Sequence, residues 1–184
     1  LEELEKEYPS LVTDLSPTQR VGHPVSSGLQ SYDHAVPMLS LSNAINDEEI
    51  TDFYKRIKKW LNNSEVDFVA EPKIDGLGVS LIYKNGILER ALTRGDGFKG
   101  EDITHNVKTI NAIPLKLRKS VKTPTFMEIR GEIFMNISDF NKLNKSRELL
   151  GEKLFANARN AAAGSVRQLD LSLIHISEPT RRVF

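Results

Sequence analysis

The chain has 184 residues, of which 39% are hydrophobic and 27% charged, and its 25 basic and 25 acidic side chains give no net charge. This balance is ordinary for a soluble globular chain of about one domain, and it excludes nucleic-acid binding through a positive field of the whole chain. The absence of cysteine excludes disulfides and thiolate metal sites, and no apolar run approaches the ~18 residues of a membrane span. We therefore expect a cytoplasmic protein without a membrane partner.

Residues 1–36 are predicted to hold the end of an N-terminal helical module and a linker. Residues 1–7, "LEELEKE", have helical character and stop near Pro9, and because residue 1 is not methionine we expect further sequence upstream. Residues 13–28, "TDLSPTQRVGHPVSSG", are rich in proline, glycine, serine and threonine, which is typical of a linker. The main domain is expected over residues 37–170.

A helix is predicted to begin after Asn46, which can cap it, with Glu49 three residues on as in a capping box. Apolar residues then recur at helical spacing and predict one buried face: Ile50, Phe53, Tyr54, Ile57 and Leu61. Basic residues near its C-terminus suit the helix dipole. A solvated face explains them, and DNA contact is the alternative.

Strands around a tight turn are predicted next. Residues 66–71 form a first strand, and residues 77–84 form a second in which alternate apolar side chains share one face. Asn85-Gly86 is the strongest short signal for a hairpin because both turn residues must tolerate positive φ. Residues 87–94 are expected to return antiparallel.

The following segments mix helices and strands. A glycine-rich loop over 95–102 precedes a predicted helix over 102–110, and a strand is expected over 126–135. Ser138 is expected to cap a helix that ends near residue 149, and a helix of small residues is expected within 155–170. Because the clearest strand pair is antiparallel, we assign the α+β class rather than a doubly wound parallel fold.

Lys73 stands between two carboxylates in "EPKIDG". If this segment is extended, Glu71, Lys73 and Asp75 point the same way, because alternate side chains of a strand share a face. A surface ladder of ion pairs is one interpretation, and a nucleophilic lysine is the other. Carboxylates favour the charged ammonium, so a nucleophile would need a ligand or Mg²⁺ on them and a cation such as Arg94 near the amine.

The segment "EPKIDG" resembles the K-x-D-G motif of covalent nucleotidyltransferases, which include DNA ligases, RNA ligases and mRNA capping enzymes. "TRGDGFKGEDIT", "EIRGEIFM" and "LFANARNAAAGSVRQLD" resemble, in the same order, segments of NAD-dependent bacterial DNA ligases, as do "SPTQRVG" and "VPMLSLSNA" upstream. The resemblance covers residues 1–170 and implies part of an adenylation domain with antiparallel sheets and flanking helices. It also implies NAD⁺ and Mg²⁺ as cofactors and nicked double-stranded DNA as partner, without an obligate protein partner.

The resemblance implies a role for each matching residue. Lys73 would attack the α-phosphate of NAD⁺ and become lysyl-AMP, and Asp75 would orient the amine or assist its deprotonation. Arg94 would contact ribose and phosphate and stabilise charge on phosphorus. Glu132 would bind the ribose or assist metal-dependent chemistry, and Glu101 matches a position near the site. AMP would then pass to a 5′-phosphate at a nick, and the 3′-hydroxyl would displace it.

Other matching positions would surround the nucleotide and the DNA. Ser40 and Leu41 would offer backbone contacts near the adenine, and Glu71 would lie on the adenine side of the pocket. Arg159 and Arg167 would bind DNA phosphates. No residue is assigned as a metal ligand.

Simpler interpretations stay open. Arg94 and Glu132 could pair structurally, and Arg159 and Arg167 could be solvated. For the chain as a whole, the alternatives are a nucleotidyltransferase that uses ATP or GTP and a non-catalytic nucleotide- or DNA-binding fragment.

Residues 171–184 are set apart. "LSLIHISEPTR" resembles the translation of a sequencing-library adapter, so we interpret this segment as a non-native tail. Later motifs of the nucleotidyltransferase domain and the other ligase modules are not in the sequence. We therefore expect the isolated chain to seal no nicks and to self-adenylylate weakly or not at all.

Overall fold

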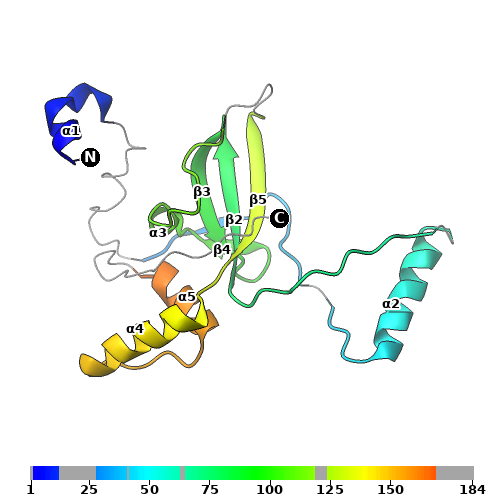
Figure 1. Cartoon of the computed structure of the whole chain (residues 1–184). Helices are drawn as coiled ribbons and strands as arrows, with labels where there is room; N and C mark the ends of the chain where they lie inside the picture. The colour runs from blue at the N-terminus through cyan, green and yellow to red at the C-terminus, as the bar shows by residue number, and fades with distance from the viewer. Residues whose placement is uncertain (1, 13–27, 41, 63–64, 119–123, 169–184) are drawn as a thin grey trace. The chain divides into compact units, whose positions relative to one another are not determined.

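The computed structural model describes residues 2–12, 28–40, 42–62, 65–118 and 124–168. The predicted linker and the predicted tail fall almost wholly outside these ranges. The elements, in chain order, are α1 (Glu2–Glu7), η1 (Pro9–Leu11), β1 (Ser31–Asp33), α2 (Asp47–Trp60), β2 (Leu77–Lys84), β3 (Ile87–Thr93), β4 (Lys99–Glu101), α3 (Thr104–Val107), β5 (Phe126–Ile133), α4 (Ile137–Leu149) and α5 (Ala158–Val166) (Figure 1).

The chain divides into two compact units. The sheet unit comprises residues 1–38 and 74–184 and contains both β-sheets with helices α3, α4 and α5. The α2 unit comprises residues 39–73. Within the ranges given above, no helix is long and apolar enough to cross a membrane.

A three-stranded antiparallel sheet in the order β3–β2–β5 is the centre of the sheet unit (Figure 1). β2 and β3 form the predicted hairpin, in which Asn85 and Gly86 have φ angles of 51° and 78°. Positive φ at both turn residues suits the right-handed twist of the strands, which is why Asn-Gly is favoured there. β5 pairs with β2 along its whole length and places Arg130 opposite Ser80.

The two faces of this sheet differ, because alternate side chains of a strand point in opposite directions. One face carries Val79, Leu81 and Tyr83, which are buried as predicted in one cluster with apolar residues of α3, the segment after it and α5. The other face carries polar side chains of β5, including Arg130 and Glu132. Burial of the first face stabilises the sheet, and the predicted site residue Glu132 lies on the second face.

The glycine-rich segment 95–102 is predicted as a loop, but part of it is a strand. β4 pairs antiparallel with β1, with Gly100 opposite Tyr32. Glycine is depleted in strands, so the local pattern carries no strand signal, and the pairing depends on a partner distant in the sequence. The helix predicted over 102–110 is shorter, since α3 spans Thr104–Val107.

Helices α4 and α5 share a smaller apolar cluster. Its buried residues are Met135, Ala161 and Ala162. The N-terminus of α4 differs from the prediction: Asn136 is the N-cap residue, without a side-chain cap bond, and Ser138 lies inside the helix. α5 is capped instead by Asn157, whose side chain accepts a hydrogen bond from the Asn160 amide at 2.8 Å.

Helix α2 has the predicted N-cap but not the predicted buried face. The Asn46 side chain accepts from the Glu49 amide at 2.9 Å, and the Glu49 carboxylate bonds the amide one residue before Asn46 at 2.6 Å. No described residue of α2 is buried; Phe53 is 44% and Tyr54 is 40% exposed. Both rings contact Phe68. A unit this small has too little apolar surface to cover a helix face.

Residues 66–71 are not a strand, contrary to the prediction. A strand needs a neighbour for its ladder of backbone hydrogen bonds, and nothing in the described part of the chain pairs with this segment. Pro72 lacks an N–H donor and suits unpaired backbone. Lys73 therefore lies in irregular backbone, and the strand geometry that would align Glu71, Lys73 and Asp75 does not form there.

Candidate active site

Glu132 ties the K-x-D-G segment to β5. Its Oε1 accepts a hydrogen bond from the Gly76 amide at 3.0 Å. A Cβ on residue 76 would lie 2.2 Å from the carbonyl oxygen of Ile133, so only glycine lets the chain pass this close to β5. The last residue of the K-x-D-G motif and a predicted site carboxylate are therefore in direct contact.

Gly78 marks the place where Glu132 and Arg94 come together. The Arg94 amide donates to the Gly78 carbonyl oxygen at 3.0 Å, just after β3 ends. A Cβ on residue 78 would lie 3.5 Å from Glu132 Oε2 and 3.7 Å from the Cβ of Arg94. The side chains of the predicted site residues Glu132 and Arg94 therefore flank Gly78, which has no side chain. A glycine within a strand often marks the close approach of a ligand.

The loop after Arg94 is held in shape by its own hydrogen bonds. Asp96 Oδ1 accepts from the amides of Phe98 and Lys99, each at 2.8 Å. These bonds favour the charged carboxylate and keep the pKa of Asp96 below its ordinary value. Gly95 has a φ of 55°, and a Cβ there would lie 1.8 Å from the Lys99 carbonyl oxygen. Arg94 thus begins a loop whose course is fixed.

Residues 34–38 lie between this loop and β5. The first and last amides of the segment donate to the carbonyl oxygens of Phe98 and Gly97, both at 2.8 Å. From β5, Arg130 donates to two carbonyl oxygens of the same segment. No motif in the sequence marks Arg130 as a site residue, because its partners are distant in the chain and the segment "EIRGEIFM" points to Glu132 alone.

Both predicted DNA-contacting arginines pair with carboxylates in the sheet unit. Arg159, in the first turn of α5, lies 3.1 Å from Asp75 Oδ1. Arg167, just past the end of α5, lies 2.7 Å from Glu101 Oε1. The arginines are 58% and 52% exposed, so these pairs are surface contacts of small energy.

A hollow of about 560 Å³ opens beside the pair of Arg167 and Glu101. Its lining includes Phe155, Asn160 and Gly164. A Cβ on Gly164 would lie 2.6 Å from the ring of Phe155, so glycine brings α5 onto this ring. That close contact sets where the end of α5, and with it Arg167, lies.

The remaining predicted site residues are in the α2 unit. Ser40, Glu71 and Lys73 are exposed there. Leu41 lies outside the described residues. Lys73 is the last residue of the α2 unit, and the chain re-enters the sheet unit at Ile74.

The described residues contain no group of three or more His, Asp or Glu side chains that could hold a metal ion alone. Mg²⁺ in phosphoryl transfer is usually held by one or two carboxylates together with substrate phosphates. Asp75 and Glu132, on either side of Gly76, are suited to that shared arrangement.

The antiparallel sheets and their helices define an α+β domain, and Gly76, Glu132 and Arg94 meet at the start of β2. Residues 26–178 match the family described as NAD-dependent DNA ligase adenylation domain. The chain belongs to this family. The matched range takes in residues 171–178, part of the segment interpreted as a tail.

The chain is also similar to bacterial DNA ligases. It is 51% identical over 179 residues to the DNA ligase of Thermomicrobium roseum, and the match covers 96% of this chain and 26% of the relative. It is 54% identical over 172 residues to the DNA ligase of Thermotoga neapolitana, and the match covers 94% of this chain and 24% of the relative. It is 55% identical over 170 residues to the DNA ligase of Pelotomaculum thermopropionicum, and the match covers 92% of this chain and 25% of the relative. The chain spans about a quarter of the length of these curated relatives. The predicted family and α+β fold class are confirmed.

Proposed function

We propose that this chain carries the nucleophile of an NAD⁺-dependent DNA ligase and that Lys73 becomes lysyl-AMP. The contact between Gly76 and Glu132 beside Arg94 carries the proposal. It gathers three segments that are distant in the sequence at one end of one sheet. Such a gathering of carboxylate and cation is what transfer of a charged phosphoryl group needs.

In the first step, the Lys73 amine attacks the α-phosphorus of the substrate NAD⁺. A nitrogen–phosphorus bond forms, the bond from phosphorus to the bridging pyrophosphate oxygen breaks, and nicotinamide mononucleotide leaves with that electron pair. Asp75 orients the amine or takes the proton that it loses. Arg94 stabilises the negative charge that gathers on the phosphate oxygens.

The other predicted contacts hold the nucleotide. In this proposal Ser40, Leu41 and Glu71 are the adenine contacts, and Glu132 binds the ribose. Asp75 and Glu132 would hold a Mg²⁺ ion, which would neutralise part of the phosphate charge.

The later steps take place on nicked duplex DNA. AMP passes from Lys73 to the 5′-phosphate at the nick, and the 3′-hydroxyl then displaces AMP and seals the strand. Arg159 and Arg167 bind phosphates of the DNA backbone. Both arginines are more than half exposed in their present pairs, so a DNA phosphate can replace the carboxylate partner at small cost.

The test uses a chimeric ligase in which residues 1–170 replace the matching segment of the Thermotoga neapolitana enzyme. NAD⁺ labelled in its adenylate half should give a covalent adduct that peptide mass mapping places on Lys73, and Lys73→Ala should give none. A folded chimera that forms no adduct would refute the proposal. An adduct formed from ATP or GTP instead would favour the other nucleotidyltransferases, and DNA binding indifferent to Lys73→Ala and to NAD⁺, without an adduct, would favour a binding fragment.

A further inference from the structure

We infer that Arg130 is a positioning residue for the transfer of AMP to Lys73. It fixes the point at which the chain leaves the sheet unit and enters the α2 unit, the segment with Ser40, Glu71 and Lys73. The inference rests on the proposed function, because its consequence is measured as a change in the KM for NAD⁺. Arg130 itself contacts backbone and another side chain, so it acts through the segment that it holds.

The Arg130 guanidinium clamps two successive carbonyl groups. Its Nη1 donates to the Pro37 oxygen at 3.0 Å, and its Nη2 donates to the Val36 oxygen at 2.5 Å. The planar guanidinium holds its donors in a fixed fork that suits two neighbouring acceptors, whereas the three donors of a lysine ammonium extend from one nitrogen and rotate freely. Two consecutive peptide groups are therefore held at a defined distance from β5.

The clamp is itself anchored. Arg130 Nε donates to Glu128 Oε1 at 3.0 Å, and the same oxygen accepts from the Ser80 hydroxyl at 2.8 Å. Ser80 is fully buried and the Glu128 side chain is 11% exposed. Because the carboxylate is fixed by the neighbouring strand, the guanidinium has one well-defined orientation.

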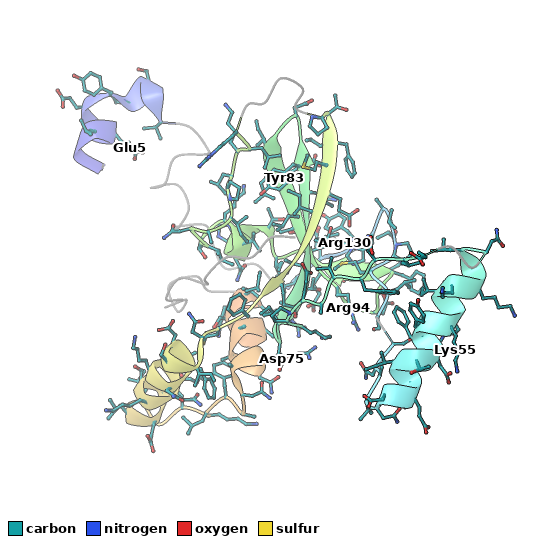
Figure 2. The ribbon with its side chains drawn as sticks, turned by 45° about the vertical axis from the view of Figure 1, so that its right-hand side comes forward. Glu5, Lys55, Asp75, Tyr83, Arg94 and Arg130 are labelled. Atoms are coloured by element: carbon teal, nitrogen blue, oxygen red, sulfur yellow. The ribbon has the colours of Figure 1, made fainter. Side chains whose placement is uncertain are left out.

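The held segment is the exit from the sheet unit. The Met38 amide, next after the clamped carbonyls, donates to Gly97 at 2.8 Å, and the α2 unit begins one residue later. The chain returns at residue 74, and the Gly76 amide bonds Glu132, two residues from Arg130 on β5. β5 therefore holds the chain both where it leaves the sheet unit, through Arg130, and where it returns, through Glu132. Figure 2 labels Arg130 and Arg94 below Tyr83, away from the hairpin turn.

Loss of the clamp should affect nucleotide binding more than the chemical step. Ser40, a predicted adenine contact, follows Met38 by two residues, so with a looser exit NAD⁺ binding must order this part of the chain anew. Asp75, Arg94 and Glu132 belong to the sheet unit and keep their own hydrogen bonds and pairs. We therefore expect a raised KM for NAD⁺ with a smaller change in kcat, whereas general damage to the fold would reduce the active fraction and leave KM unchanged.

The first experiment is amide hydrogen exchange on the 184-residue chain. Arg130→Met should speed exchange of the Met38 amide about tenfold, and Arg130→Lys should have an intermediate effect because one carbonyl can still be bonded. Glu128→Gln weakens the bond to Arg130 but retains an acceptor for the Ser80 hydroxyl, and it should also speed exchange of the Met38 amide. Lys84→Met is the matched control, since it removes a cation of β2 whose partner is Glu89. Unchanged exchange at Met38 in both Arg130 variants would overturn the inference.

The second experiment measures lysyl-AMP formation by the chimeric ligase at a series of NAD⁺ concentrations. Arg130→Met should raise KM about tenfold and Lys84→Met should leave it unchanged. If the parent chimera forms the adduct but neither Arg130→Met nor Arg130→Lys changes the KM for NAD⁺, the role inferred for Arg130 is refuted and the proposed function is not. A folded parent chimera without any adduct would refute the proposed function, and the exchange data would still report whether Arg130 holds the segment.

Discussion

Arg159 of α5 and Asp75 of the K-x-D-G segment form an ion pair with 3.1 Å between Nη1 and Oδ1. The pair joins a residue expected to contact DNA with a residue expected to act beside the nucleophile. The two side chains are 58% and 73% exposed, so water screens their attraction. The pair therefore brings together two residues with different predicted roles without contributing much to folding.

Arg159→Ala should weaken binding of nicked duplex DNA by the chimeric ligase. Loss of one phosphate contact should lower the slope of log affinity against log salt by about one. The free energy of unfolding should change by less than about 1 kcal/mol, because the pair with Asp75 is exposed. Fluorescence anisotropy at several salt concentrations measures the slope.

The matched control for Arg159 is Lys142→Ala. Lys142 lies on α4, is itself 77% exposed and pairs with Asp139 at 3.2 Å. This variant should leave the salt slope of DNA binding unchanged. Equal slopes for the parent and Arg159→Ala would contradict a phosphate contact by Arg159.

Gly76→Ala should destabilise the sheet unit by about 1–3 kcal/mol or more, since the added Cβ meets backbone that can yield only by moving β5. That Cβ would lie 2.2 Å from the carbonyl oxygen of Ile133. Gly131→Ala is the control, because nothing lies within 4 Å of its Cβ position. Urea unfolding of the two variants should show a loss for residue 76 alone, and equal stabilities would count against the close approach.

Gly86→Ala should cost about 1–2 kcal/mol, because a side chain at its φ of 78° is strained. Asn85→Gly is the companion variant, since glycine readily adopts the φ of 51° found there. It should unfold close to the parent in urea. A Gly86→Ala variant as stable as the parent would mean that the hairpin turns in another way.

Alkaline pH should destabilise the sheet unit through Tyr83. Burial raises the pKa of Tyr83 from 10.0 to about 12, so the unfolded chain loses this proton first as pH rises. The contribution of Tyr83 to the free energy of unfolding is therefore fully present below a pH of about 10. It is lost between a pH of about 10 and about 12, and it amounts to roughly 2–3 kcal/mol.

Tyr83→Phe tests this source of the pH dependence. The variant loses the hydrogen bond from the hydroxyl to the Pro114 carbonyl oxygen at 2.8 Å, so it should be less stable than the parent near neutral pH by about 1 kcal/mol. Its free energy of unfolding should then fall less steeply above a pH of about 10. Urea unfolding across this pH range gives both quantities, and parallel curves would point to other groups.

Local patterns predicted several elements correctly. β2 has the predicted bounds of 77–84, and the turn at Asn85-Gly86 and the cap at Asn46 form as expected, because each depends on residues close together in the chain. The motifs that indicated a ligase are likewise short continuous segments. Such features can be found from the sequence because their physical cause is local.

Other predictions failed where the cause was not local. Residues 66–71 have strand character but no pairing partner among the described segments, and the apolar stripe of α2 finds little surface to cover it. Ser138 is a good capping residue, yet α4 begins earlier, directly after the chain leaves β5 through the apolar cluster at Met135. In each case the surroundings decided between structures that the local sequence permits.

The sequence alone determined the hairpin, the α+β class and the family, and it supplied the predicted site residues. Only the tertiary structure decided which of these groups meet. The register of β5 against β2 places Glu132 over Gly78 and Arg130 opposite Ser80, and α5 brings Arg159 to Asp75. A hydrogen bond or ion pair between residues far apart in the chain follows from the packing of whole elements, so no short stretch of sequence contains it.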